Sequence, residues 1–181
     1  MSATIDTKKT KEIINSLKSN DIKIVKRAIK QSKVHGNEKI FGEILDLLIH
    51  HDSEEVRDVV KKFLLDLKDS KALPMIIEAI KSDEFKTVKA ELISIFWNCP
   101  LNPNEHISLF VNEAIRGDFM VALESSTVIN NIEPPFPEAE VNESLLLLKD
   151  YFSKHPEDDK TELLKDILVV IKEMEQSVNL N

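Results

Sequence analysis

The chain has 181 residues and a formal net charge of −8, with only three glycines, one tyrosine and one tryptophan. This length suits one domain or a continuous repeat array, and the composition favours helix over sheet. The excess of carboxylates argues against a dedicated binder of the nucleic-acid backbone. No run of about eighteen apolar residues occurs, so the sequence predicts no membrane-spanning helix. Because Cys99 is the only cysteine, no intramolecular disulfide can form, and we expect a cytoplasmic location.

The charge is distributed unevenly along the chain. Residues 1–90 carry 18 Lys and Arg against 15 Asp and Glu, whereas residues 91–181 carry 6 against 17. The basic start could touch nucleic acid, but no aromatic residue is interleaved before Phe41, so stacking on single strands is unsupported. A polar face that keeps the first repeat of an array in solution is the favoured interpretation.

Apolar residues at steps of three and four predict about ten helices and no strand. Polar tails are expected at 1–7 and 176–181. The helices are predicted at 8–18, 22–33, 38–50, 52–67, from the turn at 69–70 to 81, 85–97, 103–116, 118–132, 138–154 and 161–174.

Start and stop signals flank several of these helices. Asp52 and Glu55 have the spacing of a capping box. Asp21, Asp83 and Asp118 stand in the same place before three other predicted helices, and we expect each to accept from a free amide at the helix start. Gly36 suits a left-handed position at a helix end, and Asn102 is a predicted N-cap followed by Pro103.

The first helices of successive pairs align with one another. The aligned dipeptides are Val25-Lys26, Val56-Arg57, Val88-Lys89, Val121-Ala122 and Leu164-Lys165, at separations of 31, 32, 33 and 43 residues. We expect the first residue to face the core while the long cation covers the neighbouring repeat with its stem. Because one helical pair cannot bury its apolar stripe alone, a stack of pairs is predicted.

The stretch 52–83 resembles the HEAT-repeat family of α-helical solenoids. Asp52, Val56, Arg57, Leu73, Pro74 and Ile80 stand at the characteristic positions of that family, and weaker copies extend over residues 12–175. The period is shorter than the usual length of about 40–47 residues, and is closer to the short HEAT-like units of bilin lyases and related scaffold proteins. The resemblance implies an all-α, right-handed superhelix of about ten helices in antiparallel pairs, forming a single domain over residues 1–181.

The resemblance also implies a surface for partners, because the second helix of each HEAT pair lines the inner face of the solenoid. Carried onto this chain, that face exposes a mostly acidic set: Glu43, Asp46, Glu78, Lys81, Asn112, Glu113, Arg116, Glu140 and Glu143. We expect a non-catalytic scaffold or adaptor that holds a basic segment of a partner protein through dispersed carboxylates.

Three alternatives remain open. One is a nucleic-acid-binding protein related to the HEAT-like alkylpurine DNA glycosylases, although Trp97 falls on an apolar stripe and is expected to pack in the core. The second is a lyase-like or regulatory factor that acts on the cofactor of a partner protein. The third is a weak, salt-sensitive self-association, in which the basic start of one molecule docks on the acidic end of another.

No sequence pattern predicts catalysis, a metal or a cofactor. His50, His51 and Asp52 are adjacent on a helix end, where their side chains diverge instead of converging on one ion. Cys99 is expected to be a small buried hydrophobe, although a reactive thiol is an alternative. The segment Pro134–Pro137 is interpreted as a helix stopper, and a polyproline segment offered to a partner is the alternative.

Overall fold

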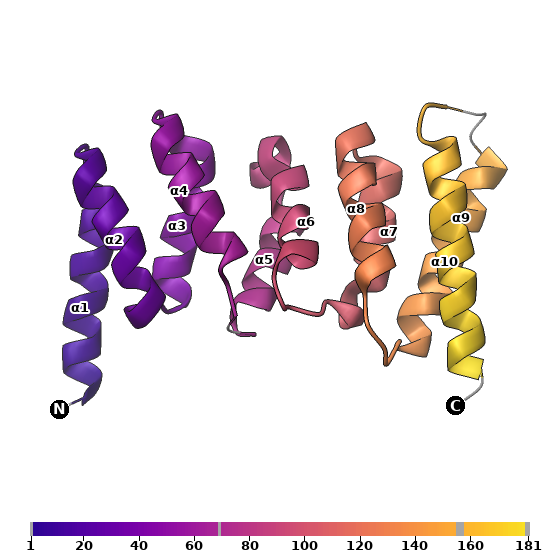
Figure 1. Cartoon of the computed structure of the whole chain (residues 1–181), viewed down its shortest axis with the longest axis horizontal. Coiled ribbons are helices and arrows are strands. Elements are labelled where there is room, and N and C mark those ends of the chain that lie inside the picture. The colour runs from indigo at the N-terminus through magenta and orange to yellow at the C-terminus, as the bar shows by residue number, and fades with distance from the viewer. Residues whose placement is uncertain (1, 69, 155–157, 180–181) are drawn as a thin grey trace. The chain divides into compact units, whose positions relative to one another are not determined.

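The computed structural model of the chain describes residues 2–68, 70–154 and 158–179, with side chains from Thr7 onward. All regular secondary structure in these residues is helical, which confirms the predicted all-α class (Figure 1). The chain divides into two compact units, which we call unit 1 (Met1–Val88) and unit 2 (Lys89–Asn181).

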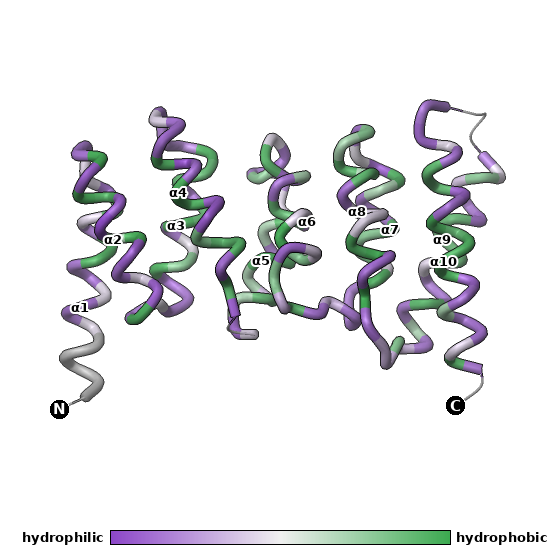
Figure 2. The backbone as a smooth tube through the Cα atoms, viewed as in Figure 1, coloured by the Kyte–Doolittle hydropathy of each residue, from purple (hydrophilic) through white to green (hydrophobic). Residues whose placement is uncertain are grey.

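Unit 1 consists of antiparallel helical pairs. Its elements are α1 (Ser2–Leu17), α2 (Ile22–His35), α3 (Glu38–His50), α4 (Glu54–Leu65), α5 (Ala72–Lys81) and the 3-10 helix η1 (Asp83–Val88). Apart from its neighbours in sequence, α1 packs against α3, α2 against α4, and α3 against α5. The even-numbered and odd-numbered helices of unit 1 therefore form two layers, and their apolar stripes are buried. Figure 2 shows hydrophobic residues recurring along each of these helices.

Unit 2 repeats this arrangement. Its elements are α6 (Lys89–Asn98), the 3-10 helix η2 (Asn104–His106), α7 (Ile107–Arg116), α8 (Phe119–Asn131), α9 (Glu138–Lys154) and α10 (Thr161–Asn179). Here α6 packs against α8, α8 against α10, and α7 against α9. The fully buried Phe110 lies in its core, where its ring meets Phe96 edge-on at a centroid distance of 5.4 Å.

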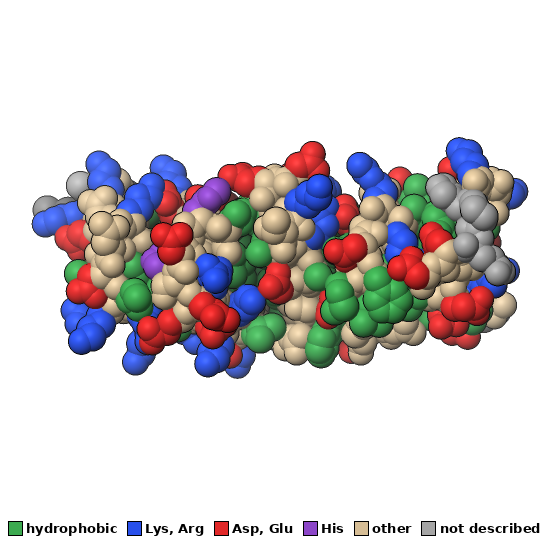
Figure 3. All heavy atoms as spheres, turned by 90° about the horizontal axis from the view of Figure 1, so that it is seen from above, with side chains coloured by type: hydrophobic (Ala, Val, Ile, Leu, Met, Phe, Trp, Pro, Cys, Tyr) green, Lys and Arg blue, Asp and Glu red, His purple; other side chains and the backbone are tan. Residues whose placement is uncertain are grey.

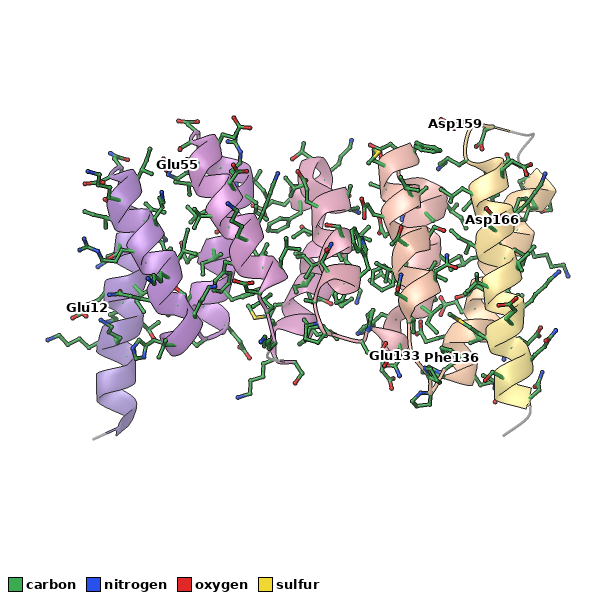
Figure 4. All side chains as sticks on the ribbon, in the orientation of Figure 1. Glu12, Glu55, Glu133, Phe136, Asp159 and Asp166 are labelled. Atoms are coloured by element: carbon green, nitrogen blue, oxygen red, sulfur yellow. The ribbon has the colours of Figure 1, made fainter. Side chains whose placement is uncertain are left out.

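Side chains about one repeat apart link successive pairs within each unit. In unit 1, Lys26 Nζ lies 2.6 Å from Glu55 Oε1, so that the cation of the first Val-Lys pair does reach the next repeat. Glu55 lies in the first turn of α4 (Figure 4). In unit 2, Asn102 Nδ2 donates to the Glu133 carbonyl at 3.0 Å, and Asn104 Nδ2 donates to the Pro135 carbonyl at 2.7 Å. The repeat spacing read from the sequence therefore corresponds to direct contacts.

Two of the four predicted aspartate caps are confirmed. The Asp21 carboxylate accepts from Lys23 N at 2.8 Å, and the Asp118 carboxylate accepts from Val121 N at 2.9 Å. The capping box at Asp52 is wrong, because α4 begins at Glu54 with Ser53 as N-cap. The imidazole of His51 accepts from Ser53 N at 3.0 Å. The N-cap of α4 is therefore one residue later in the sequence than predicted.

Several predicted helix boundaries also differ. Helix α1 begins at Ser2 instead of residue 8, and α10 continues to Asn179 through most of the expected tail; residues 180–181 lie outside the described part of the chain. The predicted helix 85–97 begins as the 3-10 helix η1, and α7 begins at Ile107 after η2 instead of at Pro103. Asn102 does not cap that helix, because its side chain is bonded to the backbone of Glu133.

Gly36 closes α2 without the left-handed geometry that we predicted. Its φ of −65° is open to any residue. The reason for glycine is close approach, because a Cβ atom at this position would lie 2.5 Å from the Ser32 carbonyl oxygen. The turn from α2 to α3 is therefore too tight for a side chain, and it places the start of α3 beside the end of α2.

Candidate partner-binding sites

Unit 1 contains a groove of about 910 Å³ at the N-terminal end of α3, which we call the α3 groove. All five helices of the unit contribute to it. Its lining residues are Thr7, Thr10, Ser32, Lys33, Val34, Gly36, Asn37, Glu38, Lys39, Ile40, Phe41, Ile44, Phe63, Asp66, Leu67, Lys68, Lys71, Ala72 and Met75.

The apolar part of the α3 groove is held by core residues of α3 and α4. The rings of Phe41 and Phe63 lie 6.4 Å apart and belong to the groove lining while remaining mostly buried. Ile40 and Ile44, on the same face of α3, continue this surface into the core. Phe41 and Phe63 are each 7% exposed and are fixed by packing, so the small apolar surface that they offer to the groove is formed before any partner binds.

The turn before α3 is also fixed. Asn37 caps the helix by accepting from Lys39 N at 3.1 Å and from Ile40 N at 3.2 Å. The amide of the same side chain donates to Thr10 Oγ1 on α1 at 2.8 Å. One residue thus ties α1 to the start of α3, at the rim of the α3 groove.

The rim of the α3 groove is predominantly basic. Four lysines line it (Lys33, Lys39, Lys68 and Lys71), against the carboxylates of Glu38 and Asp66. Lys33 Nζ lies 2.6 Å from Asp66 Oδ2. The hydrogen bond and the charge of Lys33, with a smaller contribution from Lys68, lower the pKa of Asp66. The remaining positive charge and the N-terminal end of α3 both favour an anionic ligand.

Two of the sequence-predicted residues, Glu43 and Asp46, line a second, smaller groove of about 480 Å³ at the other end of α3. Lys18 Nζ already lies 2.7 Å from Glu43 Oε1. Partial burial raises the pKa of Asp46, and the nearby carboxylates of Glu43 and Glu84 add to this effect. A cation placed beside Asp46 would relieve that repulsion, but the groove is also lined by Lys18, His50 and His51.

Several of the other predicted carboxylates are bonded to groups of their own unit. Glu78 pairs with Lys81 at 3.0 Å on α5. In unit 2, Glu140 Oε2 accepts from Ser108 N at 2.9 Å and thereby satisfies a free amide at the start of α7. Of the predicted residues of unit 2, Asn112 is half-buried, and only Arg116 and Glu143 are clearly exposed.

For Glu113 the predicted exposure is wrong. Its side chain is buried, and its Oε2 atom lies 2.8 Å from Lys89 Nζ. Glu113 is buried because the buried face of α7 is wide enough to include it. The other residues of that face are Ile107, Phe110, Val111 and Ala114. Glu113 therefore belongs to the interior of unit 2 and cannot bind a partner.

The histidines at the end of α3, Cys99 and Trp97 lie in different surroundings. His50 Nε2 lies 3.6 Å from Glu84 Oε1, and the described residues contain no group of three His, Cys, Asp or Glu side chains placed to hold a metal ion. Cys99 is half-buried, and burial raises the pKa of its thiol. Trp97 was expected in the core, but 43% of its surface is exposed, and its Nε1 donates to Glu124 Oε2 at 2.7 Å. The sequence showed an apolar stripe there but not which side of α6 the indole would occupy.

The proline segment lies between α8 and α9, at the place of Glu133 and Phe136 in Figure 4. Its backbone is bonded to the loop before α7, through the Asn102 and Asn104 side chains. It thus separates two helices, as a stopper would, and is held by its own chain.

No helix within the described ranges combines the length and apolar character needed to cross a bilayer. No protein-family model matches the chain, and comparisons with curated proteins and with solved structures give no significant match.

Proposed function

We propose that the chain is a non-catalytic protein-interaction module, and that unit 1 binds a segment of a partner protein in the α3 groove. The observation that carries this proposal is the groove itself, about 910 Å³ in volume and lined by all five helices of unit 1. Ligand sites are typically preformed, concave and largely apolar, with a few charged groups that fix orientation.

The chemistry of the α3 groove favours an acidic segment with an apolar anchor. The apolar surface around Phe41 and Phe63 would take a hydrophobic side chain, and Lys39 and Lys68 on the rim would meet carboxylates. This differs from the basic partner expected from the sequence, because the carboxylates assigned to that partner are mostly bonded within the protein.

We further propose that the helical pairs of each unit stack as HEAT-like repeats. Two features support this: the helices contact their next-but-one neighbours, and polar side chains about one repeat apart are bonded, as Lys26 is to Glu55. A scaffold of this kind offers grooves between successive pairs, which is where the α3 groove lies. The single half-buried cysteine suits the reducing, cytoplasmic compartment that we propose for it.

Site-specific photo-crosslinking tests the function. Val34 lines the α3 groove and is 77% exposed, so replacing it by p-benzoylphenylalanine should leave the fold intact. The matched control is the same replacement at Leu146, an apolar residue of α9 that is 67% exposed. We expect irradiated lysate to yield a discrete protein adduct at position 34 that is absent at position 146.

A charge-reversed groove supplies the second arm of this test. Lys39→Glu with Lys68→Glu changes two exposed side chains and should suppress the adduct at position 34. Equal adducts at positions 34 and 146, or an adduct that survives charge reversal, would contradict the proposal. Crosslinking to RNA in place of protein would support the nucleic-acid alternative.

A further inference from the structure

Unit 2 carries a cluster of large apolar side chains that the described residues of the same unit leave exposed. Its members are Trp97 on α6 and Phe119, Met120 and Leu123 on α8, with exposed fractions of 43%, 45%, 51% and 38%. We call this cluster the Trp97 patch. Single exposed apolar residues are ordinary, but contiguous clusters of them mark interaction sites.

Helical spacing and one hydrogen bond place the four side chains close to one another. Phe119 and Met120 lie three or four residues before Leu123, which places all three on one side of the first turns of α8. Trp97 joins them because its Nε1 atom lies 2.7 Å from Oε2 of Glu124, the residue after Leu123. Figure 3 shows hydrophobic side chains gathered over this part of unit 2, with acidic side chains beside them.

The core of unit 2 is formed by other side chains of α6 and α8. Helix α6 buries Leu92, Ile93, Ile95 and Phe96 on its inner side, and α8 buries a separate set that includes Val121 and Val128. The patch therefore lies outside the packed interior. An exposed tryptophan with its N–H already bonded presents a rigid apolar face, and tryptophan is among the residues that contribute most at protein interfaces.

The charges around the patch indicate the kind of partner. Glu124 contacts the indole, and Asp118 caps α8 next to Phe119. Unit 2 as a whole carries 17 Asp and Glu against 7 Lys and Arg. Lys89 and Lys160 among these cations are bonded inside the unit, so the surface field is dominated by carboxylates, with Arg116 as the nearest opposing charge in sequence.

We propose that the Trp97 patch docks a basic amphipathic helix of a partner protein. The apolar face of that helix would cover Trp97, Met120 and Leu123, and its Lys and Arg side chains would meet Glu124 and the surrounding carboxylates. This recognition mode uses apolar anchors at helical spacing in a shallow hydrophobic surface. It is independent of the α3 groove, so the protein would hold an acidic segment on unit 1 and a basic helix on unit 2.

The test uses the fluorescence of Trp97, which is the only tryptophan of the chain. The probe is a tryptophan-free helix of Leu and Lys, with about 18 residues to span roughly five turns. The control peptide has the same Leu positions and Glu in place of Lys. We expect the Leu/Lys peptide to shift the emission to shorter wavelength in a saturable way, less strongly at high salt, and the Leu/Glu peptide to leave it unchanged.

Variants locate the binding. Met120→Ser with Leu123→Ser should weaken binding of the Leu/Lys peptide by roughly tenfold or more, because the peptide then buries less apolar surface of the patch. Both side chains are exposed, so the fold should be unaffected. Leu146→Ser, on α9, is the matched control and should bind as the wild type does. The proposal is overturned if the Leu/Lys peptide leaves the emission unchanged, if both peptides act alike, or if the double variant binds normally.

A second copy of the chain is the competing occupant. Sedimentation of the free protein that shows concentration-dependent dimers, abolished by Met120→Ser with Leu123→Ser, would assign the patch to self-association and overturn the proposal. Charge reversal at Lys39 and Lys68 separates the two functional proposals, because it should abolish crosslinking in the α3 groove and leave peptide binding at Trp97 intact.

Discussion

Lys89 Nζ on α6 lies 2.8 Å from Glu113 Oε2 on α7, and only 14% and 9% of the two side chains are exposed. A buried pair of this kind contributes little net stability when compared with apolar residues of the same shape. Removing one partner is different, because it leaves the other charge buried without compensation. Replacing one of the two residues should therefore destabilise unit 2, whereas replacing both by apolar residues should change its stability much less.

Glu113→Leu or Lys89→Met alone should destabilise the protein by about 3 kcal/mol, whereas the double variant should lose far less than the sum. Urea unfolding followed by circular dichroism measures all three. Lys81→Met, which breaks the exposed pair with Glu78, is the control and should cost less than about 0.5 kcal/mol. Additive losses at positions 89 and 113 would show that the two charges are not coupled.

The same pair shows what sequence patterns could and could not predict here. The period of the repeat, the helical class and the caps at Asp21 and Asp118 follow from local rules, because spacing and side-chain length determine them. The burial of Glu113 depends on its ion pair with Lys89. Lys89 lies 24 residues away in the sequence, so no local pattern predicts this contact. The α3 groove likewise combines Thr10, Lys39 and Lys68, which no local pattern connects.

The three glycines should respond differently to alanine. Gly42 lies within α3, and a Cβ atom added there would have nothing within 4 Å, so Gly42→Ala should stabilise the protein by about 0.5–1 kcal/mol through helix propensity. Gly36→Ala and Gly117→Ala should destabilise it. At Gly36 a Cβ would lie 2.5 Å from the Ser32 carbonyl, and at Gly117 it would meet the Val121 side chain.

Thermal unfolding of the three alanine variants gives the comparison directly. The opposite signs make the prediction specific, because a general preference for alanine in helical proteins would raise all three midpoints. A stabilised Gly36→Ala variant would show that the turn between α2 and α3 is looser than the structure indicates.

Lys160 should stabilise α7 from a distance in sequence. Its Nζ donates to the carbonyls of Ala114, Ile115 and Gly117 at 3.2, 2.7 and 2.7 Å, which satisfies acceptors at and just beyond the C-terminal end of that helix. Lys160→Met keeps most of the stem and removes the charge, so we expect a loss of about 1–2 kcal/mol in urea unfolding. Lys154→Met, which breaks an exposed pair with Asp150, is the control and should cost less than about 0.5 kcal/mol.

Tyr151 provides a prediction at high pH. Burial, followed by its hydrogen bond to Asp158 Oδ2 at 2.6 Å, raises the pKa of Tyr151 to about 12. Because the folded state holds this proton more tightly than the unfolded chain does, the stability linked to it is present below the ordinary tyrosine pKa of about 10. It should then be lost as the pH rises from that value through about 12.

Tyr151 is the only tyrosine of the chain, so the tyrosinate absorbance band reports on this one group. The folded protein should titrate with a midpoint near 12 and the urea-unfolded chain near the ordinary value. Asp158→Asn should lower the folded midpoint without restoring the ordinary value, because burial is the larger cause of the shift and remains in the variant. A folded midpoint equal to the unfolded one would show that the Tyr151 hydroxyl is open to solvent and that its bond to Asp158 does not persist in solution.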